Sequence, residues 1–168
     1  KINMYTKQNF IDSFTNDIRI IKHLGTKVTP EMEGFRPSDG QRSMLELLQY
    51  LSHVGAASVD MILNNDSSKF DIHSKNAVSV NSGNFDEAMD AQQKTMIELM
   101  EKFTDEDLKT VINLYGMGDK TKGTYLVDTI GKWFPTYRMQ LFLYLKSLGV
   151  SNLGTMNMWA GMDAPQTK

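Results

Sequence analysis

The 168-residue chain contains no cysteine, which excludes disulfides, thiolate nucleophiles and cysteine metal sites and fits a reducing cytoplasm. It also lacks a long hydrophobic run, since its apolar stretches are far shorter than the roughly 20 residues that span a membrane. Neither sign of charge is in large excess, because the formal net charge is −2, and lysine and arginine are scattered along the chain. These absences argue against binding to nucleic acid or a membrane surface. We therefore expect a cytoplasmic protein.

Apolar residues instead recur at the three-to-four spacing of amphipathic helices. With 40% hydrophobic residues, the chain can bury one core, and we expect a single domain over residues 1–168. Ser43 and Glu46 form a capping-box pattern at the start of the second helix, and Pro135 is expected to kink the fourth. The sequence predicts an all-α fold, a four-helix bundle, with helices at about Thr6–Leu24, Ser43–Leu63, Phe85–Phe103 and Thr124–Leu148.

The segments between these helices are expected to be mostly irregular. Residues 64–84 are polar and predict a long loop, with Ala77–Val80 compatible with a short extended piece. Residues 111–124 fit a short helix or strand followed by a glycine-bearing turn. The tail from Val150 onward is expected to be irregular, with Trp159 as its anchor.

The three histidines are not spaced as a metal site in a helical bundle requires, where side chains converge from facing helices. On a helical wheel His53 shares a face with Glu46 and Gln49, which predicts that it faces solvent. His23 and His73 are also expected at the surface.

Aromatic residues with polar tips occupy the more informative positions. Tyr50 lies at the edge of the apolar stripe of the second helix, and Trp133 and Tyr137 lie four residues apart on one face of the fourth. Gln92 interrupts the apolar stripe of the third helix and needs a hydrogen-bond partner if it is buried. Such rings are usually part of the core, and the alternative is a pocket lined by rings with polar tips.

Two segments resemble the ligand-bearing helices of the DinB-like (YfiT-like) superfamily of small helical metalloenzymes: ELLQY (Glu46–Tyr50) and WFPTYRMQL (Trp133–Leu141). In that family, Glu-Leu-Leu-x-His and a later His-x-x-x-His followed by Arg-x-Gln-Leu supply three histidine ligands. Here Tyr50, Trp133 and Tyr137 stand at those positions, and a neutral phenol or indole does not replace imidazole for a divalent ion. The resemblance implies a DinB-like bundle, a homodimer and a site without the family's metal.

Two functional hypotheses follow. In the first, the protein needs no cofactor, and the degenerate site at Tyr50, Trp133, Tyr137 and Gln92 binds a small molecule or has a structural role. In the second, the protein is a metal-dependent thiol S-transferase or hydrolase of the DinB-like kind that uses His53 and carboxylates instead.

Overall fold

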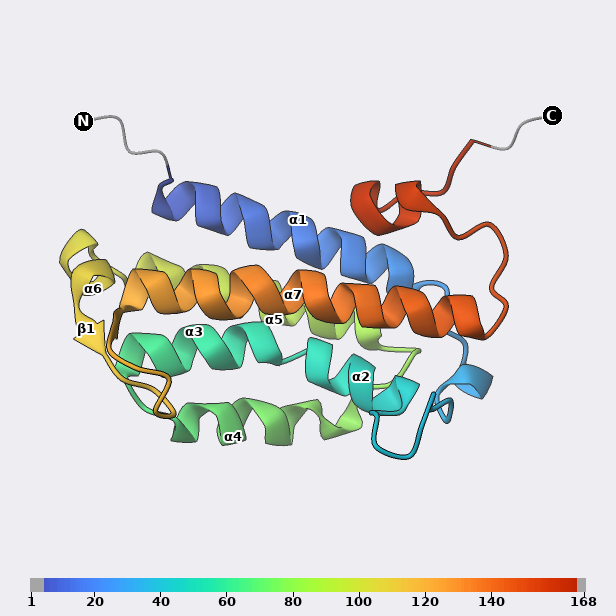
Figure 1. Cartoon of the computed structure of the whole chain (residues 1–168), viewed down its shortest axis with the longest axis horizontal. Coiled ribbons are helices and arrows are strands. Elements are labelled where there is room, and N and C mark those ends of the chain that lie inside the picture. Colours follow the sequence, from blue (N-terminus) through green and yellow to red (C-terminus); the bar gives the residue numbers. More distant parts are fainter. Residues whose placement is uncertain (1–4, 166–168) are drawn as a thin grey trace.

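The computed structural model describes residues 5–165, and it contains the four-helix bundle that the sequence predicts. The bundle consists of α1 (Lys7–Gly25), a second helix divided into α2 (Met44–Leu51) and α3 (Val54–Asn64), α5 (Phe85–Glu101) and α7 (Lys122–Ser147) (Figure 1). The capping box of Ser43 and Glu46 is present at the start of α2. Within the described residues, no helix is both long enough and apolar enough to cross a bilayer.

The segment predicted as a long loop is mostly helical, so that prediction was wrong. It contains α4 (Ser68–Asn76) and a 3₁₀ turn, η2 (Ala77–Ser79), in place of an extended piece. No residue of α4 is fully buried, so the sequence has no apolar stripe to indicate this helix. In Figure 1, α4 leads the chain back along α2 and α3, so that α5 runs in the same direction as they do. The bundle therefore has an up-down-down-up order.

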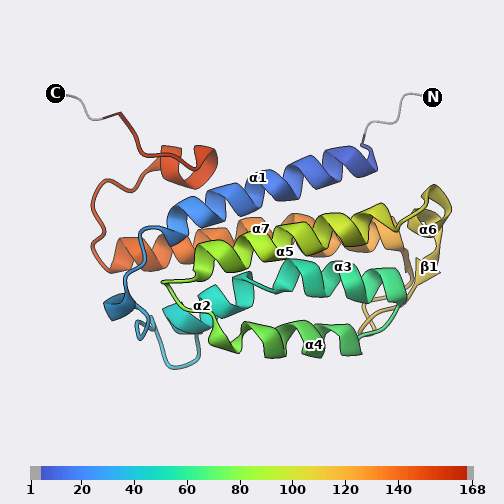
Figure 2. The same cartoon turned by 180° about the vertical axis from the view of Figure 1, so that it is seen from behind.

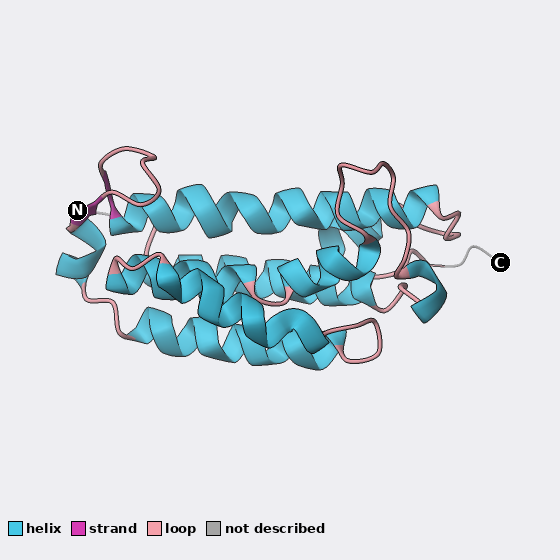
Figure 3. Ribbon diagram, turned by 90° about the horizontal axis from the view of Figure 1, so that it is seen from below, coloured by secondary structure: helices cyan, strands magenta, loops and turns pink. Residues whose placement is uncertain are grey.

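Small elements close the two ends of the bundle. At one end, α6 (Asp105–Lys109) is followed by β1 (Val111–Ile112), which pairs antiparallel with β2 (Lys120–Thr121) (Figure 3). At the other end lies the connector after α1, with the 3₁₀ turn η1 (Pro30–Met32).

The C-terminal tail is partly regular, because residues Met156–Ala160 form a π-helical turn, η3. Its anchor is not Trp159, which is 66% exposed. Asn157 is fully buried instead, and its side chain accepts from the Gly154 N–H and contacts His23 and Asp163. An amide can satisfy several buried partners at once, which the larger indole cannot do here.

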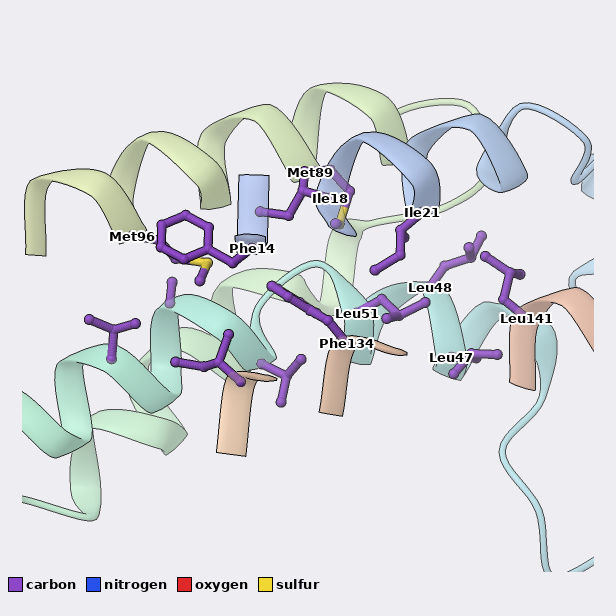
Figure 4. Packing of buried hydrophobic residues seen from close by; sticks show 14 of the residues in the cluster. Phe14, Ile18, Ile21, Leu47, Leu48, Leu51, Met89, Met96, Phe134 and Leu141 are labelled. Atoms are coloured by element: carbon purple, nitrogen blue, oxygen red, sulfur yellow. The ribbon is translucent and has the colours of Figure 1, made fainter. Parts of the chain in front are cut away.

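The core lies where α1, α2, α5 and α7 meet (Figure 4), and α5 lies between α1 and α3 on the face seen in Figure 2. Helix α7 continues without a break through Pro135. Trp133 and Tyr137, which the sequence places on one face of this helix, are only half-buried, whereas Phe134 and Arg138 are buried. The other buried apolar side chains shown are Phe14, Ile18, Ile21, Leu47, Leu48, Leu51, Met89, Met96 and Leu141.

Candidate functional site

Tyr50 and Tyr137 lie against each other between α2 and α7. Their ring centroids are 4.7 Å apart with an interplanar angle of 64°, an edge-to-face contact. Both rings are half-buried against the core, as is Trp133, one turn earlier on α7. Burial raises the pKa of the Tyr50 hydroxyl, and the neighbouring Tyr137 raises it further. The Tyr50 phenol is therefore held in its protonated form, which can donate a hydrogen bond.

Arg42 covers this pair of rings from the segment just before α2. Its guanidinium carbon lies 4.1 Å from the centroid of Tyr50 and 5.6 Å from that of Tyr137, within cation–π distance of both. The Tyr144 hydroxyl donates to the Arg42 carbonyl over 2.7 Å, which holds the segment against α7. Across residues 5–165 the Arg42 guanidinium has no ion-pair partner, whereas nearby Arg36 pairs with Glu46 at 2.9 Å.

His53 is buried, with 9% of its surface exposed, so the prediction that it faces solvent was wrong. The helical wheel failed because the helix is interrupted at residues 52–53 and because α4 packs beside this face. The rings of Tyr50 and Phe70 lie 5.6 Å and 5.5 Å from the His53 ring. Its Nδ1 lies 2.8 Å from the Gln49 carbonyl, and burial lowers the pKa of the imidazole. Its Nε2 is buried and has no hydrogen-bond partner among residues 5–165.

Gln92 causes the interruption between α2 and α3. Its Oε1 accepts from the N–H groups of Gly55 and Ala56 at 2.8 Å and 3.3 Å, and its Nε2 donates to the Leu51 carbonyl at 2.8 Å. In an unbroken helix the Gly55 N–H would bond directly to the Leu51 carbonyl. The Gln92 amide is inserted between them, which supplies the partners that a buried glutamine needs.

A buried ion pair was missed at the sequence level. Arg138 of α7 is 4% exposed at its side chain and lies 2.6 Å from Asp17 of α1. Burial raises the pKa of the Asp17 carboxyl, and the Arg138 charge opposes that rise. The only sequence signal was the position of Arg138 in the RMQL segment, because Asp17 lies far from it along the chain.

The side chains of Tyr50, Trp133 and Tyr137 do not supply the donor atoms of a transition-metal site. Two phenols and an indole are poor ligands for a divalent ion compared with imidazole. His53 lies next to Tyr50, and its Nδ1–H is donated to the Gln49 carbonyl, which leaves only its Nε2 as a possible ligand. Within the described part of the chain, no group of three or more histidine, cysteine, aspartate or glutamate side chains is placed to hold a metal ion.

Comparisons with known proteins give structural likeness without sequence matches. No protein-family model matches the sequence, and no curated protein matches it. A DinB-like protein of Bacillus subtilis, YjoA, superposes with a TM-score of 0.68 and 16% identity, over 86% of this chain and 95% of its own. A DinB-family protein from Exiguobacterium sibiricum gives 0.65 and 21%, over 92% and 99%.

A third similar structure is a DinB-like protein from Bacillus cereus, with a TM-score of 0.62 and 14% identity over 88% of this chain and 96% of its own. At these identities the likeness establishes the fold and not the chemistry. The agreement covers almost the whole length of all three neighbours. The chain therefore has the DinB-like fold that its helical segments resemble.

Proposed function

We propose that this protein binds a small anionic molecule at the site formed by Arg42, Tyr50 and Tyr137. It does so without the metal ion that three histidines hold in the DinB-like family. In this proposal the three positions that correspond to the family's ligands, Tyr50, Trp133 and Tyr137, have become a binding site of aromatic side chains. Catalysis is not required for this function.

The position of Arg42 carries the proposal. The planar guanidinium of arginine stacks on aromatic rings and matches the geometry of carboxylates and phosphates, and none of the described residues supplies a carboxylate to Arg42. Guanidinium and phenol hydroxyl groups are the donors with which proteins bind carboxylates and phosphates. The protonated Tyr50 hydroxyl adds such a donor beside the charge.

The competing interpretation is purely structural. Two rings 4.7 Å apart fill the space between α2 and α7, and Arg42 shields them from water. In that case the cluster stabilises the bundle and recognises no ligand. Thiol transfer or hydrolysis with a metal is less well supported, because His53 has no second and third ligand beside it in residues 5–165.

Calorimetric titration with benzoate and with inorganic phosphate separates these functions. We expect saturable binding of at least one anion, and a loss of about tenfold or more in affinity for Arg42→Gln, which removes a charge-assisted hydrogen bond. Arg36→Gln is the matched control, since Arg36 is close in sequence but already paired with Glu46.

Two results would count against the proposal. Binding of neither anion to the native protein would leave only the structural role. Equal weakening by Arg42→Gln and Arg36→Gln would show a general effect of charge and no specific site. Urea unfolding of each variant verifies that the folded state is intact.

A further inference from the structure

A cavity lies between α3, α4, η2 and α5, and Arg42, Tyr50 and Tyr137 are not among the residues that line it. Its volume is about 440 Å³, within the usual range of small-molecule sites. Alanines from α3 and α5 form part of its wall, and its polar lining includes Ser52, His53, His73, Glu87 and Thr95. No lysine or arginine lines it among the described residues.

The hydrogen bonds of His73 determine which of its ring nitrogens is a donor. Its Nε2 lies 3.0 Å from an oxygen of Asp60, and the other oxygen of that carboxylate accepts from the Asn64 amide at 2.7 Å. Because a carboxylate only accepts, Nε2 carries the proton. In the neutral ring, Nδ1 is then an acceptor, and no described residue donates to it.

The tautomer of His53 is also determined by a hydrogen-bond partner, but the proton lies on the other ring nitrogen. The Gln49 carbonyl can only accept, so the His53 Nδ1 carries the proton and its Nε2 presents a lone pair. That Nε2 is buried, and the part of the chain in the structure supplies no donor to it. Both imidazoles on the wall of this cavity therefore have an acceptor nitrogen with no proton donor.

Two hydroxyl groups of the lining, those of Ser52 and Thr95, have also used their hydrogens. Ser52 donates to the Gln49 carbonyl at 2.7 Å, and Thr95 donates to the Ala91 carbonyl at 3.0 Å. Their oxygens remain as acceptors, and Glu87 adds a carboxylate.

The Asn76 amide and the Ser79 hydroxyl also line the cavity and can donate, but Glu87 gives it a negative charge with no lysine or arginine among its described residues to offset it. Its acceptors and its charge disfavour an anion and favour a cationic ligand rich in N–H donors.

We propose that this cavity binds a small primary amine in its ammonium form. The three N–H donors of the ammonium group match the Nδ1 of His73, the carboxylate of Glu87 and a hydroxyl oxygen, and a short alkyl chain contacts the alanine wall. This site has the opposite polarity to the one at Arg42. The argument for the amine does not use the anion site. The two sites are neighbours, because the His53 ring contacts the Tyr50 ring.

Titration with butylamine, monitored by the imidazole NMR signals of His53 and His73, tests the proposal in the native protein. Butanol and butyrate have similar size without the positive charge. We expect saturable shifts of the His73 signals with butylamine, and much weaker or no shifts of the same signals with the other two. The His53 ring contacts Tyr50 of the anion site, so only the His73 signals decide the comparison with butyrate. The His23 signals, from outside the cavity, serve as the internal reference.

Charge substitutions on α5 provide the second measurement. Glu87→Gln removes the carboxylate of the cavity, whereas Glu98→Gln removes an equal charge from an exposed position on the same helix. We expect the first to weaken butylamine binding about tenfold and the second to leave it nearly unchanged. Absence of saturable butylamine shifts, an equal shift of the His73 signals with butyrate, or equal effects of the two substitutions would overturn the proposal.

Discussion

The Gly55 N–H of α3 donates to the side-chain Oε1 of Gln92 on α5 across 2.8 Å, in place of a backbone hydrogen bond within its own helix. The same amide donates to the Leu51 carbonyl one turn earlier. This insertion separates α2 from α3 and turns the chain at residues 52–53. The position of the interruption decides which way Tyr50 and His53 face, so both candidate sites depend on Gln92.

Replacement of Gln92 by leucine is expected to lower the free energy of unfolding by about 2–4 kcal/mol, because the Leu51 carbonyl and the Gly55 N–H both lose a buried partner. Gln93→Leu is the control, since Gln93 is half-exposed and next to Gln92 on α5. Urea unfolding of both variants measures the difference. A loss below about 1 kcal/mol for Gln92→Leu would indicate that α2 and α3 re-form the direct backbone bond at little cost.

Two glycines in helices are expected to respond to alanine with opposite signs. A Cβ at Gly55 would lie 2.5 Å from the Phe134 ring and 2.6 Å from the Met96 sulfur, so Gly55→Ala is expected to destabilise the protein by about 1–3 kcal/mol. At Gly131 a Cβ meets only a Val127 methyl at 3.9 Å. Gly131→Ala is therefore expected to stabilise by about 0.5–1 kcal/mol. Thermal unfolding distinguishes them, and the same sign for both would contradict the packing at Gly55.

The sequence predicted the four long helices because each carries a regular apolar stripe along its length. Residues of α1 such as Phe14 and Ile18 follow that spacing and are buried as expected. The break at residues 52–53 was not predictable from α2 and α3, since its cause is a side chain on α5. Helix α4 was missed for a related reason: without a buried stripe, it is specified by contacts and not by periodicity.

The candidate sites were predictable only in part. The aromatic identity of positions 50, 133 and 137 could be read directly from the segments that resemble DinB-like proteins. The position of Arg42 over Tyr50 depends on the fold of the connector after α1, for which the sequence gives no periodic signal. The acceptor character of His73 depends on Asp60, which approaches only because α4 packs on α3.

Loss of Arg138 is expected to be costly, because it leaves Asp17 buried without its counter-charge. We expect Arg138→Met to destabilise the protein by about 3–5 kcal/mol at neutral pH, and Asp17→Leu combined with Arg138→Met to recover most of that loss. Burial raises the pKa of Asp17 in the folded state, and more so without Arg138. The folded state then binds the proton more tightly than the unfolded chain, so stability is lost as the pH rises through the raised pKa.

Urea unfolding of these variants as a function of pH measures this effect. The defect of Arg138→Met should shrink in acid, where Asp17 is protonated, and grow toward neutral pH. A defect that is independent of pH, or a double variant as unstable as the single one, would show that packing of Arg138 matters more than its charge.

Helix α7 carries exposed apolar residues in an oblique row of positions four apart, which we expect to contact a second copy of the chain. Val127, Met139 and Leu143 are 45%, 41% and 52% exposed, and Gly131 and Pro135 continue the same spacing of four residues. We expect sedimentation to give about twice 19.1 kDa, and Leu143→Glu to yield a monomer. Val78→Glu is the control, because Val78 is 72% exposed on η2, far along the chain from this row. A native monomer, or a dimer unaffected by Leu143→Glu, would contradict this interface.

The metal content of the purified protein tests the interpretation of positions 50, 133 and 137. With a tyrosine, a tryptophan and a second tyrosine in place of imidazoles, we expect no stoichiometric zinc or nickel by elemental analysis. The combined substitutions Tyr50→His, Trp133→His and Tyr137→His should create a three-nitrogen zinc site with a fourth position open to water. Each loss of ring volume costs on the order of 1–3 kcal/mol, so the folded state of the variant has to be verified first.

A variant with glutamine at the same three positions is the matched control, because it loses similar ring volume without gaining imidazole. Zinc bound by the histidine variant and not by the glutamine variant would establish that these positions converge as the DinB-like ligands do. Equal zinc binding by the parent and the folded histidine variant would show that the alignment of these positions is wrong. A stoichiometric transition metal in the parent protein would refute the proposal of metal-free function. The described residues contain no other group of three or more histidine, cysteine, aspartate or glutamate side chains that could hold such an ion.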